Sequence, residues 1–428
     1  MAEIRPFRAL RFQTKNAGDI SLLTCPPYDI ISEEQRQAFL KTNPHNIIRL
    51  ELPKGENPYE EAGETLRDWI DQGILKRDTD PALYIYEEEF EVNGEKKRVK
   101  GFICRVKVEE FEKGVVLPHE ETLSKAKADR FNLMKATFCN FSQIYSLYMD
   151  EEHQTLSRID ALSSGTPLQE FNDGAVTHRL WVVNDKAAIE AICNDFSDRK
   201  LYIADGHHRY ETSINFRNWC REEGLSVPGD DPDYVMMMLV DMEHDGLVVF
   251  PTHRLVRDLP DFDPSALIEG SRQYFDVSVQ EDISQIEPQL DKLYQEGKKA
   301  FAFYAGGDQW NLMVLKDLSV MEEILPEKSK AYQGLDVTVL HSLVLERLLK
   351  IDAENMAQQI NLTYTRSFTE AIDSVKTGES QCAFILNPTR VSEIRDVAAA
   401  GEKMPQKSTY FYPKLITGLA MNQMDLKK

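Results

Sequence analysis

The sequence predicts a mixed α+β fold in two lobes, with mixed sheets, a strand-turn-helix anion site and a C-terminal α+β lobe. Its 428 residues exceed the usual size of one domain, which favours two lobes that share one site. One stretch, 201–219, has the pattern of a strand, a tight turn and a helix. Near residue 261 the pattern changes to a compact α+β alternation. We therefore expect lobes over 1–260 and 261–428.

The first part of the chain predicts short elements around one hairpin. The pair Pro26-Pro27 forces an extended loop that presents Tyr28 and Asp29. The expected elements are a helix over 33–42 after Ser32, a strand over 47–52, an amphipathic helix over 59–73, and strands over 82–92 and 97–108. The last two flank Asn93-Gly94, the dipeptide typical of a tight hairpin turn.

The stretch from residue 115 to 135 combines a loop with a basic segment. Pro118 ends a strand and leaves His119 and Glu120 in a loop, where catalytic groups are often placed. The helix that follows carries Lys125 and Arg130 in a basic cluster, which could hold a phosphate. His119 and Glu120 are candidate acid/base or metal groups. The alternative is that the basic cluster is an ordinary exposed helix face.

The central stretch predicts an anion site. The apolar run 201–204 stops at Asp205 and Gly206, and the next helix would open with unpaired N–H groups because Gly206 allows a positive φ. His207, His208 and Arg209 follow directly, so a phosphate or carboxylate there would meet backbone and side-chain donors. The alternative is that these three side chains only cap and pair on a solvated helix start.

A third element also ends in a histidine and an arginine. The strand over 247–255 is broken at Pro251 and places His253 and Arg254 at its end. Together with the loop at 119 and the turn at 206, this repetition indicates that three elements converge on one pocket.

The predicted second lobe ends in a basic loop. We expect strands over 274–279, 300–304, 311–315, 358–365 and 382–387, and helices over 285–297, 337–349, 367–377 and 391–400. The closing loop contains Lys403, Lys407, Ser408, Thr409 and Lys414, and it predicts a lid or anion clamp. The alternative is a surface tail whose lysines serve solubility. The aromatic residues at 410–412 favour packing over a free tail.

Composition limits the partners. The net charge of -21 opposes binding to nucleic acid and to anionic membranes, whereas a locally basic pocket still suits a small anionic metabolite. No apolar run is long enough to cross a bilayer, and the first residues lack the apolar core of a signal peptide, so we expect a cytoplasmic protein. The six scattered cysteines predict buried thiols. No sequence feature indicates an oligomeric state.

Five motifs carry a resemblance to a known family. They are residues 25–31, 117–122, 203–212, 250–254 and 403–414. In this order they resemble a bacterial and archaeal family designated DUF1015. The segment Asp205–Arg209 is also similar to the phosphate-binding turn of the ParB and sulfiredoxin superfamily, which includes a free serine kinase. This second resemblance implies nucleotide or phosphoryl chemistry, with residues 206–209 contacting phosphate and Glu120 or Asp205 near the reacting hydroxyl.

The leading prediction is a phosphoryl-transfer enzyme, a kinase or phosphatase, that acts on a small phosphorylated metabolite or a hydroxyl such as that of serine. Glu120 would be the base or a metal ligand, and His207 or His208 would protonate the leaving oxygen. The expected cofactors are Mg²⁺ or another divalent metal, and a nucleotide. One alternative is a metal-dependent hydrolase with Zn²⁺ or Mn²⁺ on His119, Glu120, Asp205, His207 and His208. Another is a ParB-like nucleotide-binding or DNA-partition protein without enzymatic activity.

Overall fold

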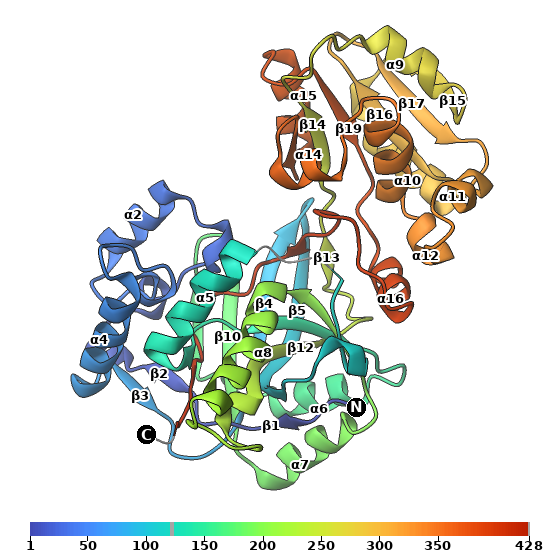
Figure 1. Ribbon diagram of the computed structural model, residues 1–428. Coiled ribbons are helices and arrows are strands. Elements are labelled where there is room, and N and C mark those ends of the chain that lie inside the picture. Colours follow the sequence, from blue (N-terminus) through green and yellow to red (C-terminus); the bar gives the residue numbers. More distant parts are fainter. Residues whose placement is uncertain (120–123, 427–428) are drawn as a thin grey trace. The chain divides into compact units, whose positions relative to one another are not determined.

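The chain folds into two compact units. The computed structural model describes residues 1–119 and 124–426, and the side chains of 124–126 lie outside this description. Unit 1 comprises Met1–Val248 and Pro413–Lys428, and unit 2 comprises Val249–Tyr412 (Figure 1). The division differs from the predicted boundary at residue 260. One reason is that the strand at 253–256 pairs within the sheet of unit 2, and the other is that the last residues return to unit 1.

Unit 1 is built on a nine-stranded mixed sheet. The strand order is β6-β11-β8-β12-β5-β4-β10-β9, with β1 beside β5. The strands are β1 (Ile4–Arg5), β4 (Leu83–Val92), β5 (Glu95–Lys107), β6 (Val116–Leu117), β8 (Ile144–Tyr148), β9 (Gln169–Asn172), β10 (Thr177–Val183), β11 (Leu201–Asp205) and β12 (Tyr234–Asp241). The predicted hairpin is confirmed, because β4 and β5 pair directly and both Asn93 and Gly94 have positive φ. Within this sheet, β11 is parallel to β6 and antiparallel to β8.

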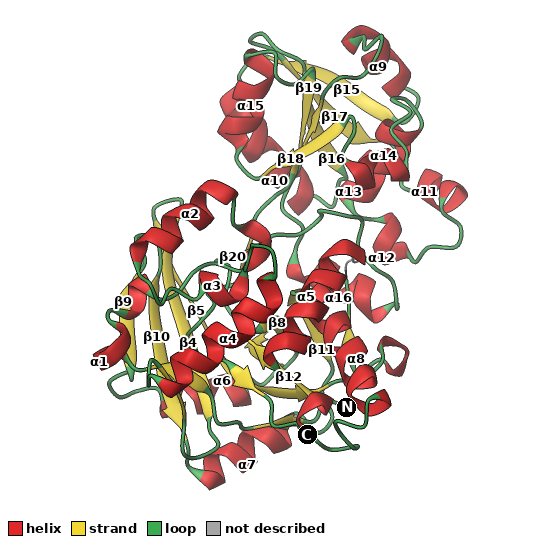
Figure 2. Cartoon of the chain, turned by 60° about the vertical axis from the view of Figure 1, so that its left-hand side comes forward, coloured by secondary structure: helices red, strands yellow, loops and turns green. Residues whose placement is uncertain are grey.

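Helices pack around this sheet (Figures 1 and 2). The helices of unit 1 are α1 (Thr14–Ala17), α2 (Glu33–Thr42), α3 (Ile48–Glu51), α4 (Pro58–Asp71), α5 (Ser124–Thr137), α6 (Gln154–Leu162), α7 (Lys186–Asp195) and α8 (His207–Glu222). Ile159 of α6, Ile192 of α7 and Ile214 of α8 join the apolar strand residues in the main core. The motif at 203–212 therefore lies where β11 leaves the core and α8 starts.

Short strands and loops near both ends of the chain pair with each other in unit 1. The short strands β2 (Leu10–Phe12) and β3 (Leu75–Arg77) pair with each other, and β7 (Cys139–Asn140) pairs with β21 (Asn422–Gln423). The amide of Leu10 donates to the carbonyl of Met421 at 2.9 Å. The hydroxyl of Tyr84 on β4 donates to the carbonyl of Phe7 at 3.3 Å. The C-terminal segment is thereby part of unit 1 rather than a tail.

The segment predicted as a strand over 47–52 is a helix. Residues Ile48–Glu51 form α3, and Asn46 accepts a hydrogen bond from the amide of Ile48 at 2.9 Å. A short apolar run does not distinguish a buried helix from a buried strand, and this prediction was wrong for that reason. The helix places Glu51 in the interior, next to the site described below.

Unit 2 contains a six-stranded sheet in the order β15-β17-β16-β19-β14-β18, and neighbouring strands are antiparallel. The strands are β14 (His253–Val256), β15 (Phe275–Gln280), β16 (Ala300–Tyr304), β17 (Trp310–Leu315), β18 (Leu362–Thr365) and β19 (Cys382–Ile385). The main helices are α9 (Pro264–Ser271), α10 (Ile286–Gln295), α11 (Ser319–Ile324), α14 (Ala353–Gln358), α15 (Phe368–Lys376) and α16 (Val391–Ala399). Apolar side chains of α10 and α15 join those of the sheet in one core cluster. The predicted α+β fold is confirmed in both units.

Within the described residues, no helix is long and apolar enough to cross a membrane.

Candidate functional site at the start of helix α8

The turn between β11 and α8 has the backbone that the sequence predicted. Gly206 adopts a left-handed conformation, with φ 98° and ψ 29°. A Cβ atom at this position would also lie 3.0 Å from the guanidinium of Arg209, so glycine is required by conformation and by space. No side chain caps the helix at Gly206. The N-cap glycine therefore offers no side chain to the first amides of α8, where the positive end of the helix dipole lies.

Asp205 holds two cations at this helix start. Nη2 of Arg209 donates to Oδ2 of Asp205 at 2.7 Å, and Nζ of Lys414 donates to Oδ1. Nη1 of Arg209 donates to the carbonyl of Gln143 at 2.5 Å, which fixes the guanidinium from a second side. Burial opposes ionisation of Asp205, but Lys414 and Arg209 outweigh it and lower the pKa of the carboxyl to about 2. These three side chains thus carry one net positive charge above that pH.

Two buried imidazoles stand beside Asp205. The rings of His119 and His207 meet edge to face, with their centroids 4.6 Å apart. Nε2 of His207 accepts a hydrogen bond from the amide of His119 at 3.1 Å, and Nδ1 of His119 lies 2.5 Å from the carbonyl oxygen of Ile203. A carbonyl accepts only a donor, so Nδ1 of His119 carries the proton and Nε2 is the basic nitrogen. Nε2 of His207 accepts the hydrogen bond from the amide of His119, so this nitrogen carries no proton.

Burial keeps both imidazoles neutral. It lowers the pKa of His119 to about 4, and the pKa of His207 falls well below its usual range because of burial and the adjacent His119. At neutral pH these rings are hydrogen-bonding groups without charge. The positive charge of the site therefore comes from Arg209, Lys414 and the helix.

The lowered histidine pKa predicts an acid-sensitive fold. Because His119 has a pKa of about 4 in the folded state and 6.5 in the unfolded state, only the unfolded chain binds this proton between those values. The free energy of unfolding should rise with pH across this window. The difference between the two pKa values, 6.5 and about 4, corresponds to about 3 kcal/mol. Urea unfolding at pH 7 and pH 4.5 measures the loss. The variant His119→Gln should lose less stability on acidification than the wild type, and an equal loss would contradict the assignment.

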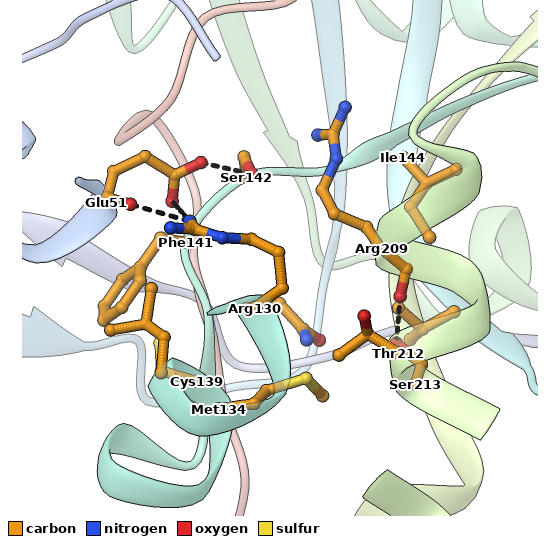
Figure 3. Close-up of a pocket in the computed structure, with 13 residues that line it drawn as sticks. Glu51, Arg130, Met134, Cys139, Phe141, Ser142, Ile144, Arg209, Thr212 and Ser213 are labelled. Atoms are coloured by element: carbon orange, nitrogen blue, oxygen red, sulfur yellow. Dashed lines mark hydrogen bonds and ion pairs between the residues drawn. The ribbon is translucent and has the colours of Figure 1, made fainter. Parts of the chain in front are cut away.

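A second group of polar side chains adjoins this corner. The guanidinium of Arg130 on α5 stacks over the ring of Tyr28 at 4.0 Å and donates to the backbone carbonyl of Glu51 at 2.7 Å. The hydroxyl of Ser142 donates to the Glu51 carboxylate at 2.9 Å. Burial raises the pKa of Glu51, and the charges of Arg130 and Arg209 oppose this increase. Figure 3 shows Glu51 and Arg130 pointing toward each other at one side of a cavity.

The cavity itself lies between α5 and α8. Its volume is about 40 Å³, enough for a few water molecules. Among the described residues, the hydroxyl of Thr212 and Nε of Arg209 are buried at its wall without a hydrogen-bond partner. The guanidinium that binds Asp205 therefore keeps one donor without a partner in the described part of the chain.

Comparison with known proteins identifies the family. A family model described as "Protein of unknown function (DUF1015)" matches residues 4–338. The chain belongs to the DUF1015 family. This membership was predicted from the five motifs and is confirmed, whereas the resemblance to the ParB and sulfiredoxin superfamily stays a prediction. A search of curated proteins gave no match.

Solved structures similar to this DUF1015 protein have low sequence identity. They include a conserved hypothetical protein from Pyrococcus furiosus, with 14% identity and a TM-score of 0.36 over 75% of this chain and 94% of that chain. A free serine kinase variant in complex with AMP has 12% identity and a TM-score of 0.37, over 76% and 92% of the two chains. A truncated SbnI from Staphylococcus aureus has 10% identity and a TM-score of 0.37, over 74% and 86%.

The structure assembles part of the predicted site in unit 1. The corner brings together His119, Asp205, Gly206, His207 and Arg209, and His208 is the half-buried neighbour that interacts electrostatically with His207. Arg130 belongs to the adjoining group. Glu120 and the side chain of Lys125 lie outside the described residues. The remaining predicted residues are in unit 2: His253, Arg254, Lys403, Lys407, Ser408 and Thr409.

Several residues at the corner were not predicted as site residues of this DUF1015 protein. Glu51 and Gln143 were hidden, because one lies in a helix mistaken for a strand and the other acts through its backbone carbonyl. Tyr28 and Asp29 could have been found, because the rigid Pro26-Pro27 loop was predicted to present them. Both interact electrostatically with Arg209. Lys414 was predicted as part of an anion clamp, and the structure places its ammonium on Asp205.

Within the described residues, no group of three or more histidine, cysteine, aspartate or glutamate side chains is arranged to hold a metal ion. The predicted metal candidates were His119, Glu120 and Asp205. Both oxygens of Asp205 already accept hydrogen bonds from cations, so in this arrangement Asp205 does not fit the role of a metal ligand.

Proposed function

We propose that this DUF1015 protein is a phosphoryl-transfer enzyme that acts on a small phosphorylated metabolite or on a hydroxyl such as that of serine. The observation that supports the proposal is the pair of cations, Arg209 and Lys414, held on one carboxylate at the uncapped start of α8. Phosphoryl transfer depends mainly on positioning and on neutralising the charge of the transferred group. A phosphate at this corner would meet backbone amides, a guanidinium with a spare donor and an ammonium.

The proposed step uses groups of the chain. The hydroxyl oxygen of the acceptor forms a bond to phosphorus while the bond from phosphorus to the leaving oxygen breaks. Glu120 takes the proton of the hydroxyl, and His208 gives a proton to the leaving oxygen. Arg209 and Lys414 neutralise the phosphoryl oxygens. With water as the acceptor, the same arrangement would hydrolyse a phosphate ester.

Asp205 has a supporting role in this proposal. A carboxyl with a pKa of about 2 is a weak base at neutral pH, so it is poorly suited to take a proton from a hydroxyl. Its contacts instead fix the positions of Arg209 and Lys414. We assign Asp205 as the residue that orients the two cations. A nucleotide is the expected phosphate donor, with its terminal phosphate at the start of α8.

A ligand screen tests the proposal. Thermal unfolding of the full chain is measured with ATP, ADP, phosphoserine, serine and Mg²⁺, singly and in pairs, because a ligand of the native state raises the melting temperature. We expect stabilisation by a phosphorylated ligand, followed by formation or loss of phosphoserine in ³¹P NMR. The variant Arg209→Gln should weaken the stabilisation and slow the conversion by about 10²–10³-fold. If no phosphorylated compound stabilises the wild type or is converted by it, the proposal is wrong.

A further inference from the structure

Unit 2 contains a buried arginine whose contacts are all with uncharged groups. Arg254 is the second residue of β14, and it is 1% exposed. Its Nε donates to Nε2 of His341 at 3.2 Å, and its Nη1 donates to the carbonyl of Thr252. Its Nη2 lies 3.3 Å from the carbonyl of Gln406 and 3.1 Å from that of Lys407. The guanidinium is therefore held by one imidazole and three carbonyls.

No carboxylate of the described chain forms an ion pair with Arg254. The register pairs Arg254 with Tyr364 on β18 and Phe384 on β19, and its guanidinium lies 5.5 Å from the centre of the Tyr364 ring. Burial in these surroundings lowers the pKa of Arg254 to about 10, which still leaves it charged at neutral pH. A buried charge without a counterion is strongly unfavourable, so the fold retains this arginine at a cost in stability.

Two carboxyl groups line the same small cavity as Arg254, but they interact with a different cation. Glu393 lies 3.7 Å from the ammonium of Lys299. Burial raises the pKa of Asp336 to about 7, and it is Lys299 that opposes this increase. The positive charge of Arg254 is therefore not matched by either group.

The imidazole beside Arg254 lies in an unusual helical segment. His341 belongs to a π-helix, Leu340–Glu346, and such segments in proteins occur frequently at functional sites. Burial lowers the pKa of His341 well below its usual range, so the ring is neutral and its Nε2 accepts from Arg254. The π-helix is thus a second unusual feature next to Arg254, in addition to the missing counterion.

A basic loop covers the guanidinium. Residues 403–409 supply two of the carbonyls that contact Arg254, and Lys407 in this loop has a positive φ of 55°. Thr389, in the segment after β19, donates to the carbonyl of Ser408 in this loop at 2.8 Å. The cavity under the loop has a volume of about 10 Å³ and is lined by Arg254, Thr252, Thr389, Asn387 and Ser408. It has room for one water-sized group, so a larger group would have to move the loop.

We propose that Arg254 is the centre of an oxyanion-binding site in unit 2, which takes the phosphate or carboxylate group of a small ligand. The anion replaces the carbonyls of Gln406 and Lys407 as the partner of the guanidinium, because a charged oxygen forms a stronger, bidentate contact with arginine than a backbone carbonyl does. Thr252 lines the same cavity, and the hydroxyls of Thr389 and Ser408, which donate to the carbonyls of Ser408 and Pro405, become donors to the anion when the loop moves. Binding of the anion and the position of the 403–409 loop are thereby coupled.

Hydrogen exchange of the full chain tests this site locally. Exchange is followed in peptides covering 252–257, 338–346 and 403–410, with inorganic phosphate or acetate added and sodium chloride at equal ionic strength as the reference. We expect exchange in the first two segments to slow about tenfold when the probe reaches ten times its dissociation constant. Phosphate alone would identify a phosphate site, and both probes would identify a general oxyanion site. Equal exchange in all three salts would overturn the proposal.

Two variants distinguish binding of the anion at Arg254 from general effects of the salt on exchange. Arg254→Met removes the charge and should abolish the slowing at 252–257, while any slowing at 205–213 in unit 1 persists. Arg272→Met removes a half-exposed arginine of the same unit that pairs with Glu269, and it should behave like the wild type. The same slowing in Arg254→Met as in the wild type would contradict the proposal. If Arg254→Met does not fold, Arg254→Lys replaces it, and unchanged phosphate affinity in that variant would contradict the bidentate contact.

Discussion

Replacing Asp205 with asparagine is expected to destabilise unit 1 by about 3–5 kcal/mol, because it leaves two buried cations without their counterion. The two contacts of Asp205 with Arg209 and Lys414 are largely shielded from solvent, since none of the three side chains is more than 15% exposed. An amide still accepts one hydrogen bond, but it provides no negative charge. Urea unfolding measures the change, with hydrogen exchange at α8 as the local readout because the two units can unfold in separate transitions.

The control for this experiment is Asp425→Asn. Asp425 also pairs with an arginine, Arg77, but its side chain is 66% exposed. Exposed ion pairs contribute about 0–1 kcal/mol, so this variant should remain close to the wild type. Equal unfolding free energies for the two variants would show that the buried carboxylate does not hold the corner together.

Replacing Arg209 with glutamine is expected to lower the turnover of the proposed phosphoryl transfer by about 10²–10³-fold, the usual effect of removing one preorganised donor to a developing charge. The fold should survive, because Lys414 still neutralises Asp205. Arg209→Lys keeps the charge but loses the bidentate geometry of the guanidinium. It should have more activity than Arg209→Gln and less than the wild type, since an ammonium cannot bind bidentately. Phosphoserine formation or hydrolysis, measured with the substrate found in the ligand screen, provides the rate.

Two further variants complete this test. Arg98→Gln removes an arginine that is 60% exposed in the hairpin, and its turnover should equal that of the wild type. Glu120→Gln should lose turnover as Arg209→Gln does, because Glu120 is the proposed base. Unchanged turnover in both Arg209→Gln and Glu120→Gln would remove the enzymatic proposal, even if phosphate still binds.

Local patterns were sufficient to predict the backbone of the candidate site. The apolar run ending at Asp205, followed by a glycine, specified a strand, a left-handed turn and a helix, and all three are present. The Asn93-Gly94 turn was equally informative, because few other dipeptides accept two consecutive positive φ angles. These features depend on the conformational limits of a few adjacent residues, so they can be inferred without knowledge of the tertiary structure.

The partners of these residues were not predictable in the same way. The cation that neutralises Asp205 comes from Lys414, more than two hundred residues later, and the carbonyl that holds Arg209 belongs to Gln143. Glu51 was missed because the period of a short apolar run does not distinguish α3 from a strand. Unit 2 begins earlier than the predicted boundary at residue 260, because β14 joins a sheet whose other strands follow it in sequence. Such contacts depend on topology, which local periodicity does not specify.

The return of residues 413–428 to unit 1 has a consequence for synthesis on the ribosome. Translation proceeds from the N-terminus, so unit 2 can emerge and fold while unit 1 still lacks its final segment. Until then, Asp205 has Arg209 but not Lys414, and the amide of Leu10 lacks its bond to Met421. A nascent chain stopped at residue 412 would therefore carry the full helix α8 and an incomplete charge arrangement. The charge arrangement of the corner is completed only once Lys414 has been synthesised.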